Sequence, residues 1–240
     1  MSEEHKALPW RHISKASNAA LRYIDGRRKG EIKSLATPWK KFNNISMGGI
    51  EWQTITTIAG MSGSGKTAVL GQLETGLKDL NQEDDFAILS FNFEMLSSRL
   101  VARKLSNKMK ITTQQLYSAS ENFSLNDNYY MNAVNEARKL NDYDIYYVDI
   151  PGSVKSLETT VLKFAQEMKK PVIVMLDHTL LVKKAGGAQD RDLLYDLMAM
   201  FNGLKKLIKV SFILISQMNR NIEASERIQN PDLHLSLIHI

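Results

Sequence analysis

The stretch GMSGSGKT, residues 60–67, places three glycines and two serines around a loop that ends in a lysine and a threonine. It fits the pattern G-x-x-x-x-G-K-[ST], which runs from Gly60 through Gly65 to Lys66 and Thr67. The glycines remove Cβ atoms, so backbone N–H groups can surround the oxygens of a phosphate. The stretch therefore predicts a phosphate-binding loop, provided that a strand precedes it and a helix follows it.

The flanking sequence meets that condition. The alternative is a Gly/Ser linker that precedes a lysine by chance, and such a linker would not need a strand before it and a helix after it. TITTIAG (54–60) is rich in β-branched residues and favours a strand, whereas TAVLGQLETGLKDL (67–80) has helical periodicity. The predicted ligands are ATP and Mg²⁺, with Lys66 reaching the β- and γ-phosphates and Thr67 ligating the metal. The predicted nucleotide-binding residues of the loop are Gly60, Met61, Ser62, Gly63, Ser64, Gly65, Lys66 and Thr67.

Composition bounds the class of protein. The 240 residues are 43% hydrophobic and 24% charged, as expected for one α/β domain with a buried core. The absence of cysteine excludes disulfides and cysteine-ligated metal sites. Apolar runs such as PVIVML (171–176) are too short to cross a membrane, so we expect a cytoplasmic protein without a membrane partner. A net charge of +5 permits a nucleic-acid partner without requiring one.

Short apolar strands alternate with helical segments from Trp52 onward. This alternation predicts right-handed βαβ crossovers and an α/β fold with a mostly parallel central sheet flanked by helices. Ligands bind such sheets at the carboxyl ends of the strands. The predicted strands are 54–60, 86–93, 144–150, 171–177 and 210–217, and the predicted helices are 67–80, 97–109, 128–140, 156–170 and 192–209.

The N-terminal segment differs from the rest of the chain. Ile13, Ala20 and Ile24 recur at helical spacing before the basic stretch DGRRKGE, which predicts an amphipathic helix and a linker. The helix could pack on its own domain or dock on a neighbouring subunit, and the pattern leaves both open. The expected organisation is a linker over 1–38, an ATPase core over 39–234 and a non-native tail over 235–240.

Three polar side chains lie at the carboxyl ends of predicted strands. Glu94 could orient and polarise an attacking water, although an acid there could also belong to the first turn of the next helix. Asp177 suits a contact to Mg²⁺ through water, or a cap on the following turn. Gln217 could sense the γ-phosphate or be an ordinary polar strand end, and Arg220 is a second sensor candidate. Lys66, Glu94 and Gln217 are thus the candidate catalytic residues, and the strand pattern alone leaves both interpretations of Glu94 and Gln217 open.

Four blocks together resemble the C-terminal RecA-like ATPase domain of DnaB-type replicative helicases. The phenylalanine–x–x–Glu–Met and Ser-Gln-x-x-Arg blocks discriminate best, and SLATPWKKFNNISMGGI (34–50) resembles the segment that leads into that core. The resemblance covers residues 13–233 and leaves no room ahead for the family's primase-interacting domain, which favours a phage source over a bacterial one. The four blocks are GMSGSGKT, FNFEM (91–95), VIVMLDHTLLV (172–182) and ISQMNRNIE (215–223).

The resemblance implies a P-loop NTPase that assembles as a homo-hexameric ring around single-stranded DNA. ATP hydrolysis between subunits would drive translocation and duplex unwinding, and primase or a helicase loader would be further partners. The N-terminal helix would then dock on the next subunit. The family's functional residues map onto Lys66, Thr67, Glu94, Asp177 and Gln217.

VKKAGGAQDR (182–191) falls where the family has a loop that faces DNA. Its lysines could pair with phosphates and its glycines would let the backbone approach the strand, although such a charge run is also typical of a solvated loop tip. No aromatic residue interleaves with the lysines, so base stacking is not predicted. The candidate DNA-binding residues are Lys183, Lys184, Gly186, Gly187 and Arg191.

The chain departs from the family pattern at its end, NPDLHLSLIHI, before the expected lysine and arginine fingers. A trans-acting arginine raises the rate of comparable NTPases by about 10³–10⁵. We therefore expect this polypeptide to bind ATP, to hydrolyse it weakly and not to unwind DNA. Robust turnover stimulated by DNA would refute that expectation.

Two other functions remain open at this point. A RecA-like recombinase or KaiC-type regulatory ATPase shares the loop and the base, and a 5′-to-3′ unwinding assay would separate it from a helicase. An ATP-dependent assembly scaffold is the other alternative. Glu94→Gln distinguishes it, because a motor should lose unwinding but keep DNA binding, whereas a scaffold should keep its whole activity.

Overall fold

The computed structural model describes residues 9–119, 124–183 and 189–217. The chain divides into two compact units, residues 1–34 and residues 35–240. In the described part of the chain, no helix is both long and apolar enough to cross a membrane.

The first unit contains the predicted N-terminal helix, α1 (Ile13–Arg28). His12 caps its start, where the ring Nδ1 accepts a hydrogen bond from the backbone N–H of Ser14 at 3.2 Å. Its apolar side chains are largely exposed, with Ile13 at 74% and Ile24 at 59%. The helix is thus amphipathic, as the sequence predicted, with an apolar face that remains accessible.

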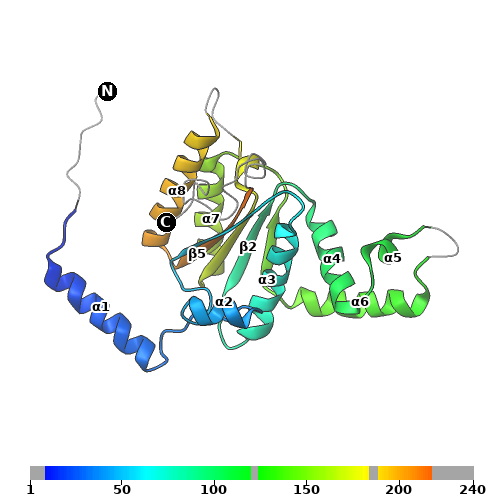
Figure 1. Cartoon of the computed structure of the whole chain (residues 1–240), viewed down its shortest axis with the longest axis horizontal. Coiled ribbons are helices and arrows are strands. Elements are labelled where there is room, and N and C mark those ends of the chain that lie inside the picture. The colour runs from blue at the N-terminus through cyan, green and yellow to red at the C-terminus, as the bar shows by residue number, and fades with distance from the viewer. Residues whose placement is uncertain (1–8, 120–123, 184–188, 218–240) are drawn as a thin grey trace, which may run out of the picture. The chain divides into compact units, whose positions relative to one another are not determined.

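The second unit is built on a sheet of five parallel strands in the order β1-β5-β4-β2-β3 (Figure 1). This confirms the predicted α/β class and the predicted parallel sheet. Because all of these strands run the same way, their carboxyl ends meet at one edge, where the register aligns Gly60 with Gln217 and Asn92 with Asp177. The strands are β1 (Ile55–Gly60), β2 (Ala87–Asn92), β3 (Ile145–Val148), β4 (Val172–Asp177) and β5 (Val210–Gln217).

Helices cover both faces of the sheet (Figure 1), and the side chains of the central strand β4 pack against helices on each face. Its side chains alternate, so Val174 packs with a cluster that includes α7 and α8, and Met175 packs with a cluster that includes α3. With both faces covered, all six residues of β4 are buried, which explains its continuous apolar sequence. The covering helices are α3 (Lys66–Leu80), α7 (Val154–Met168) and α8 (Asp190–Leu207).

The helices α4 (Ser97–Met109), α5 (Thr113–Tyr117) and α6 (Asp127–Asn141) lie together on one side of the sheet (Figure 1). The α4 and α6 bounds agree with the predicted segments to within a residue or so. Sequence periodicity did not predict α5, nor α2 (Lys40–Ile45) and the 3₁₀ turn η1 (Thr179–Leu181). These elements are too short to repeat an apolar face, so periodicity gives no signal for them.

The segment that leads into the core is tied to α3 by side-chain hydrogen bonds. Asn81 accepts from the backbone N–H of Ala36 at 2.8 Å and donates to its carbonyl at 3.0 Å. Leu35 and Ile50, at the two ends of the segment that contains α2, form an antiparallel bridge. The predicted phosphate-binding loop, residues 60–67, is therefore anchored through α3 on one side and β1 on the other.

Candidate functional site

The loop between β1 and α3 has the backbone that its glycines allow. Gly63 and Gly65 adopt φ values of 78° and 87°, in the left-handed region that residues with a Cβ rarely occupy. A Cβ at Gly60 would come within 2.6 Å of the Ser64 hydroxyl oxygen. The loop closes on itself through a hydrogen bond from Ser64 N–H to the Met61 carbonyl at 3.2 Å.

The N-terminus of α3 has no side-chain cap. By contrast, Asn126 caps α6 and Ser153 caps α7, each by accepting a hydrogen bond from the helix backbone. The first N–H groups of an α-helix lack partners within the helix, and the helix dipole adds positive charge at that end. An uncapped start preceded by two left-handed glycines therefore suits an anion such as phosphate.

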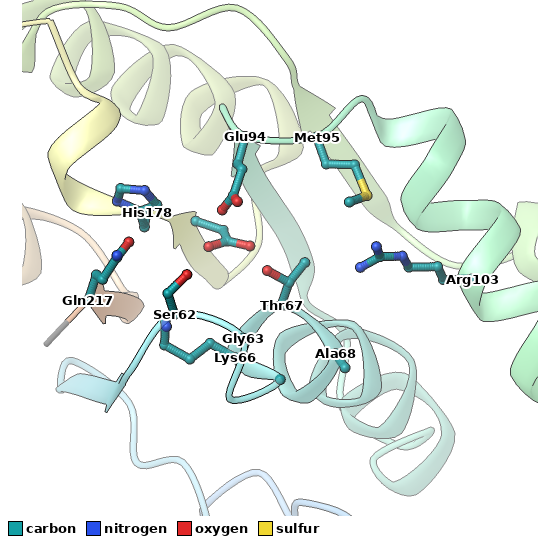
Figure 2. A pocket seen from close by; sticks show the side chains of 12 residues that line it. Ser62, Gly63, Lys66, Thr67, Ala68, Glu94, Met95, Arg103, His178 and Gln217 are labelled. Atoms are coloured by element: carbon teal, nitrogen blue, oxygen red, sulfur yellow. The ribbon is translucent and has the colours of Figure 1, made fainter. Parts of the chain in front are cut away.

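A cavity of about 330 Å³ lies over this loop at the carboxyl edge of the sheet (Figure 2). In Figure 2, Glu94 and His178 lie across the cavity from the loop, and Gln217 and Arg103 lie at its two sides. The lining comes from segments far apart in the sequence that the parallel strands bring together. The lining residues are Ser62, Gly63, Gly65, Lys66, Thr67, Ala68, Glu94, Met95, Arg103, Asp177, His178 and Gln217.

The cavity brings together most of the catalytic and nucleotide-binding residues that the sequence predicted. Of the loop, Gly60, Met61 and Ser64 shape the backbone without lining the cavity. Lys183 and Arg191 are exposed and do not line it. Four further predictions lie outside the described residues: Lys184, Gly186, Gly187 and Arg220.

The Thr67 hydroxyl donates a hydrogen bond to the carboxylate of Asp177, which is only 4% exposed. Burial raises the pKa of Asp177 above its usual value, and the charge of Glu94 acts in the same direction. The hydrogen bond from Thr67 and the positive charge of Lys66 oppose this rise. The Lys66 ammonium itself donates to the Met61 carbonyl oxygen at 2.6 Å. Two carboxylates thus face one cavity, and burial makes the charge of one of them, Asp177, costly.

Asp177→Asn is expected to raise the melting temperature of the ligand-free, metal-free protein at pH 7. The raised pKa means that folding disfavours the ionised form, so the native carboxylate costs stability above its unfolded-state pKa, and that cost disappears as pH falls below that value. The difference in melting temperature between variant and wild type should therefore shrink as the pH is lowered. Scanning calorimetry in the presence of a chelator measures this difference, and each kcal/mol of unfolding free energy should shift the melting temperature by about 2–4 °C. A variant less stable than wild type at pH 7 would contradict this account of Asp177.

Four residues that line the cavity were not predicted as site residues from the sequence: Arg103, Met95, Ala68 and His178. Arg103 makes no ion pair or hydrogen bond to any residue that the structure describes, and its guanidinium points toward the cavity in Figure 2. Four basic residues lie on α4, so the sequence offered no way to choose this one. His178 keeps a buried Nδ1 that has no hydrogen-bond partner among the described residues.

The sequence profile of the DnaB-like helicase C-terminal domain matches residues 34–236. The chain belongs to this family. The match includes the loop, the Glu94 and Asp177 strand ends and the strand that ends at Gln217, which are the segments that form the cavity. A comparison with curated protein sequences gives no match.

Two solved structures show the DnaB-like fold in this chain. One, described as a DnaB-like replicative helicase and its interactions with primase, has a TM-score of 0.69 at 18% identity and covers 87% of this chain. The chain spans about half of that helicase, 49% of its length. The other, described as an ATPase domain, has a TM-score of 0.65 at 16% identity, over 87% of this chain and 73% of that domain. Both likenesses support the RecA-like fold.

Proposed function

We propose that this chain is the ATPase motor domain of a replicative DNA helicase, which couples ATP hydrolysis to movement along single-stranded DNA. One observation carries the proposal. The phosphate-binding loop, with Lys66 and Thr67, lines the same cavity as Glu94, Asp177 and Gln217. These are the groups that a P-loop NTPase needs to bind a triphosphate and to activate water.

The loop would bind the phosphates of ATP through backbone N–H groups at the start of α3. Lys66 would exchange its contact with the Met61 carbonyl for one with the β- and γ-phosphates, because its side chain already lies along the loop. Arg103, unpaired within the described ranges, would add a second positive charge from α4. The two cations would offset the repulsion between a triphosphate and the two carboxylates.

The residues present also fit Mg²⁺. The Thr67 hydroxyl and the Asp177 carboxylate lie within hydrogen-bond reach of each other, and both are oxygen ligands of the kind that this metal prefers. Thr67 would bind it directly and Asp177 through water. When bound, Mg²⁺ supplies positive charge that neutralises the transferring phosphoryl group.

Glu94 is the proposed general base. It follows β2, which pairs with β4 such that Asn92 lies opposite Asp177, and its side chain lines the cavity across from the loop. Its carboxylate would accept a proton from the attacking water or orient that water. Gln217 lies opposite Gly60 in the register, beside the loop, where its amide would sense the γ-phosphate.

The proposed nucleic-acid contacts lie downstream of β4. Lys183 is exposed and belongs to the segment 182–191, which follows the strand that ends at Asp177. We propose that this segment binds single-stranded DNA, that the protein acts as a homo-hexamer in the cytoplasm, and that primase or a loader binds the ring. The exposed apolar face of α1 is consistent with docking on a second copy.

Binding of a labelled oligo-dT to the full chain tests the DNA-binding part of this function. Lys183→Ala should weaken binding and lower the slope of log K against log salt by about 0.7, because each phosphate contact on a single strand releases a counterion. Affinity for a non-hydrolysable ATP analogue should not change. Lys163→Ala is the matched control, since Lys163 is an exposed lysine on α7, away from the cavity lining. Equal DNA affinity and salt slope for wild type and Lys183→Ala would contradict the DNA-facing assignment.

A further inference from the structure

Helix α3 buries an ionisable side chain on its core face. Leu70, Leu73 and Leu77 form the apolar stripe of this helix. Glu74 lies on the same stripe, four residues after Leu70, where an apolar residue would be expected. Glu74 is 1% exposed. A carboxylate at such a position needs partners, because an unpaired buried charge is costly.

Three donors from three different elements converge on the Glu74 carboxylate. The Lys104 ammonium of α4 forms an ion pair with Oε2, and the Ser90 hydroxyl of β2 donates to Oε1 at 2.6 Å. The Tyr147 hydroxyl of β3 donates to Oε2 at 3.2 Å. Lys104 is 7% exposed, and its ammonium lies 5.5 Å from the centre of the Tyr147 ring. Burial, together with the negative charge of Glu74, raises the pKa of Tyr147, so its hydroxyl remains a donor.

Such an ion pair is expected to fix the relative position of the two helices that carry it, and to add little to the free energy of unfolding. The desolvation of two buried charges largely offsets their attraction, so an ion pair in a core adds little net stability compared with apolar residues of the same size. Each charged group can nevertheless find its hydrogen-bond and ion-pair partners in very few positions within the core. Lys104 therefore defines one position of α4 against α3 and β3.

Helix α4 borders the candidate nucleotide site. Arg103 is the neighbour of Lys104 and lines the cavity, and Met95 lines it two residues before the helix begins. The start of α4 is held separately by Asp149, beyond the end of β3, whose carboxylate accepts from the backbone N–H and the hydroxyl of Ser97 at 3.1 and 2.7 Å. The helix is thus attached at its first residue and again at its middle.

We propose that Glu74, Lys104 and Tyr147 form a buried clamp that positions α4 and thereby places the Arg103 guanidinium at the nucleotide cavity. Glu74 and Lys104 are positioning residues in this proposal, and they act through Arg103 without touching the ligand. The statement about the ligand rests on the proposed function, whereas the statement about α4 does not.

The double variant Glu74→Gln/Lys104→Met tests the clamp while leaving no unpaired buried charge. Glutamine keeps one acceptor oxygen for the Ser90 hydroxyl, and its amide N–H can donate to the Tyr147 hydroxyl oxygen in place of the second acceptor. Methionine keeps most of the lysine stem. We expect the affinity for a Mg²⁺-bound, non-hydrolysable ATP analogue to fall about tenfold, as for loss of one hydrogen bond to a charged group. Arg103→Ala should cause a similar loss, and combining all three substitutions should weaken binding no further. Lys78→Met is the control, because Lys78 is a half-buried lysine on α3 that donates to the Phe86 carbonyl instead.

Hydrogen exchange of the ligand-free protein supplies a readout that does not depend on nucleotide. The amides of α4 should exchange faster in the double variant than in wild type, whereas those of β4 should not change. Unchanged exchange in α4, wild-type nucleotide affinity in the double variant, or additive losses with Arg103→Ala would each overturn the clamp. If the wild type fails to bind the analogue, the proposed function is wrong, and the exchange of α4 alone then decides whether the clamp exists.

Discussion

Glu94→Gln is expected to lower the rate of ATP hydrolysis by about 10²–10⁴-fold, the usual contribution of a general base. Glutamine has nearly the same shape as glutamate and can still hydrogen-bond a water molecule, but it cannot accept a proton from it. Removing one of the two carboxylates that line the cavity also reduces repulsion toward a triphosphate, so affinity should be equal or higher. Single-turnover phosphate release at saturating ATP measures the rate, and equilibrium titration with a non-hydrolysable analogue measures the affinity.

The control for this experiment is Glu167→Gln, which neutralises an exposed carboxylate on α7. It should leave both hydrolysis and affinity unchanged. If Glu94→Gln hydrolyses ATP at the wild-type rate while binding it normally, Glu94 is not the base. A loss of affinity as large as the loss of rate would instead indicate that Glu94 holds the ligand in place.

Lys66→Ala is expected to weaken binding of the Mg²⁺-bound ATP analogue by roughly ten- to a hundredfold, because one hydrogen bond to a charged group is worth about 1.5–3 kcal/mol. The lysine stem lies along the loop and its ammonium contacts only the Met61 carbonyl in the described structure, so the substitution removes little from the fold. The melting temperature of the ligand-free variant should therefore stay close to that of wild type.

Isothermal titration and a thermal melt on one preparation separate these effects. Lys155→Ala serves as the control, since Lys155 is an exposed lysine whose side chain is 82% accessible. AMP should bind Lys66→Ala and wild type alike, because Lys66 is assigned to the β- and γ-phosphates, which AMP lacks. A variant that keeps its affinity for the triphosphate analogue would contradict the assignment of the loop.

The sequence predicted the sheet well because the strands are short apolar or β-branched runs between helices of ordinary length. Three of them, β2, β4 and β5, are almost wholly buried. The strand over 210–217 was placed to the residue, and helix α4 matched its predicted bounds over 97–109. The loop over 60–67 was recognisable as a candidate phosphate-binding loop because that function requires particular residue types at fixed spacing. The juxtaposition of Glu94, Asp177 and Gln217 then followed from the parallel order of the strands.

Other features could not be predicted in this way, for identifiable physical reasons. Arg103 lines the cavity because of the way α4 packs against the rest of the fold, and a local sequence pattern does not encode that packing. Glu74 breaks the apolar stripe of α3, yet its partners come from residues 90, 104 and 147, which no spacing rule connects. The short helix α5 begins with a capping box between Thr112 and Gln115, a signal that was present in the sequence and was overlooked.

A structure of the protein with Mg²⁺ and a non-hydrolysable ATP analogue tests the central claim most directly. We predict that the triphosphate lies along residues 62–67, with Lys66 contacting its terminal phosphates and the metal held between Thr67 and the side of the cavity that carries Asp177. Glu94 should face the γ-phosphate from the end of β2. An analogue bound elsewhere on the molecule, or a triphosphate that leaves Lys66 bonded to the Met61 carbonyl, would contradict the account.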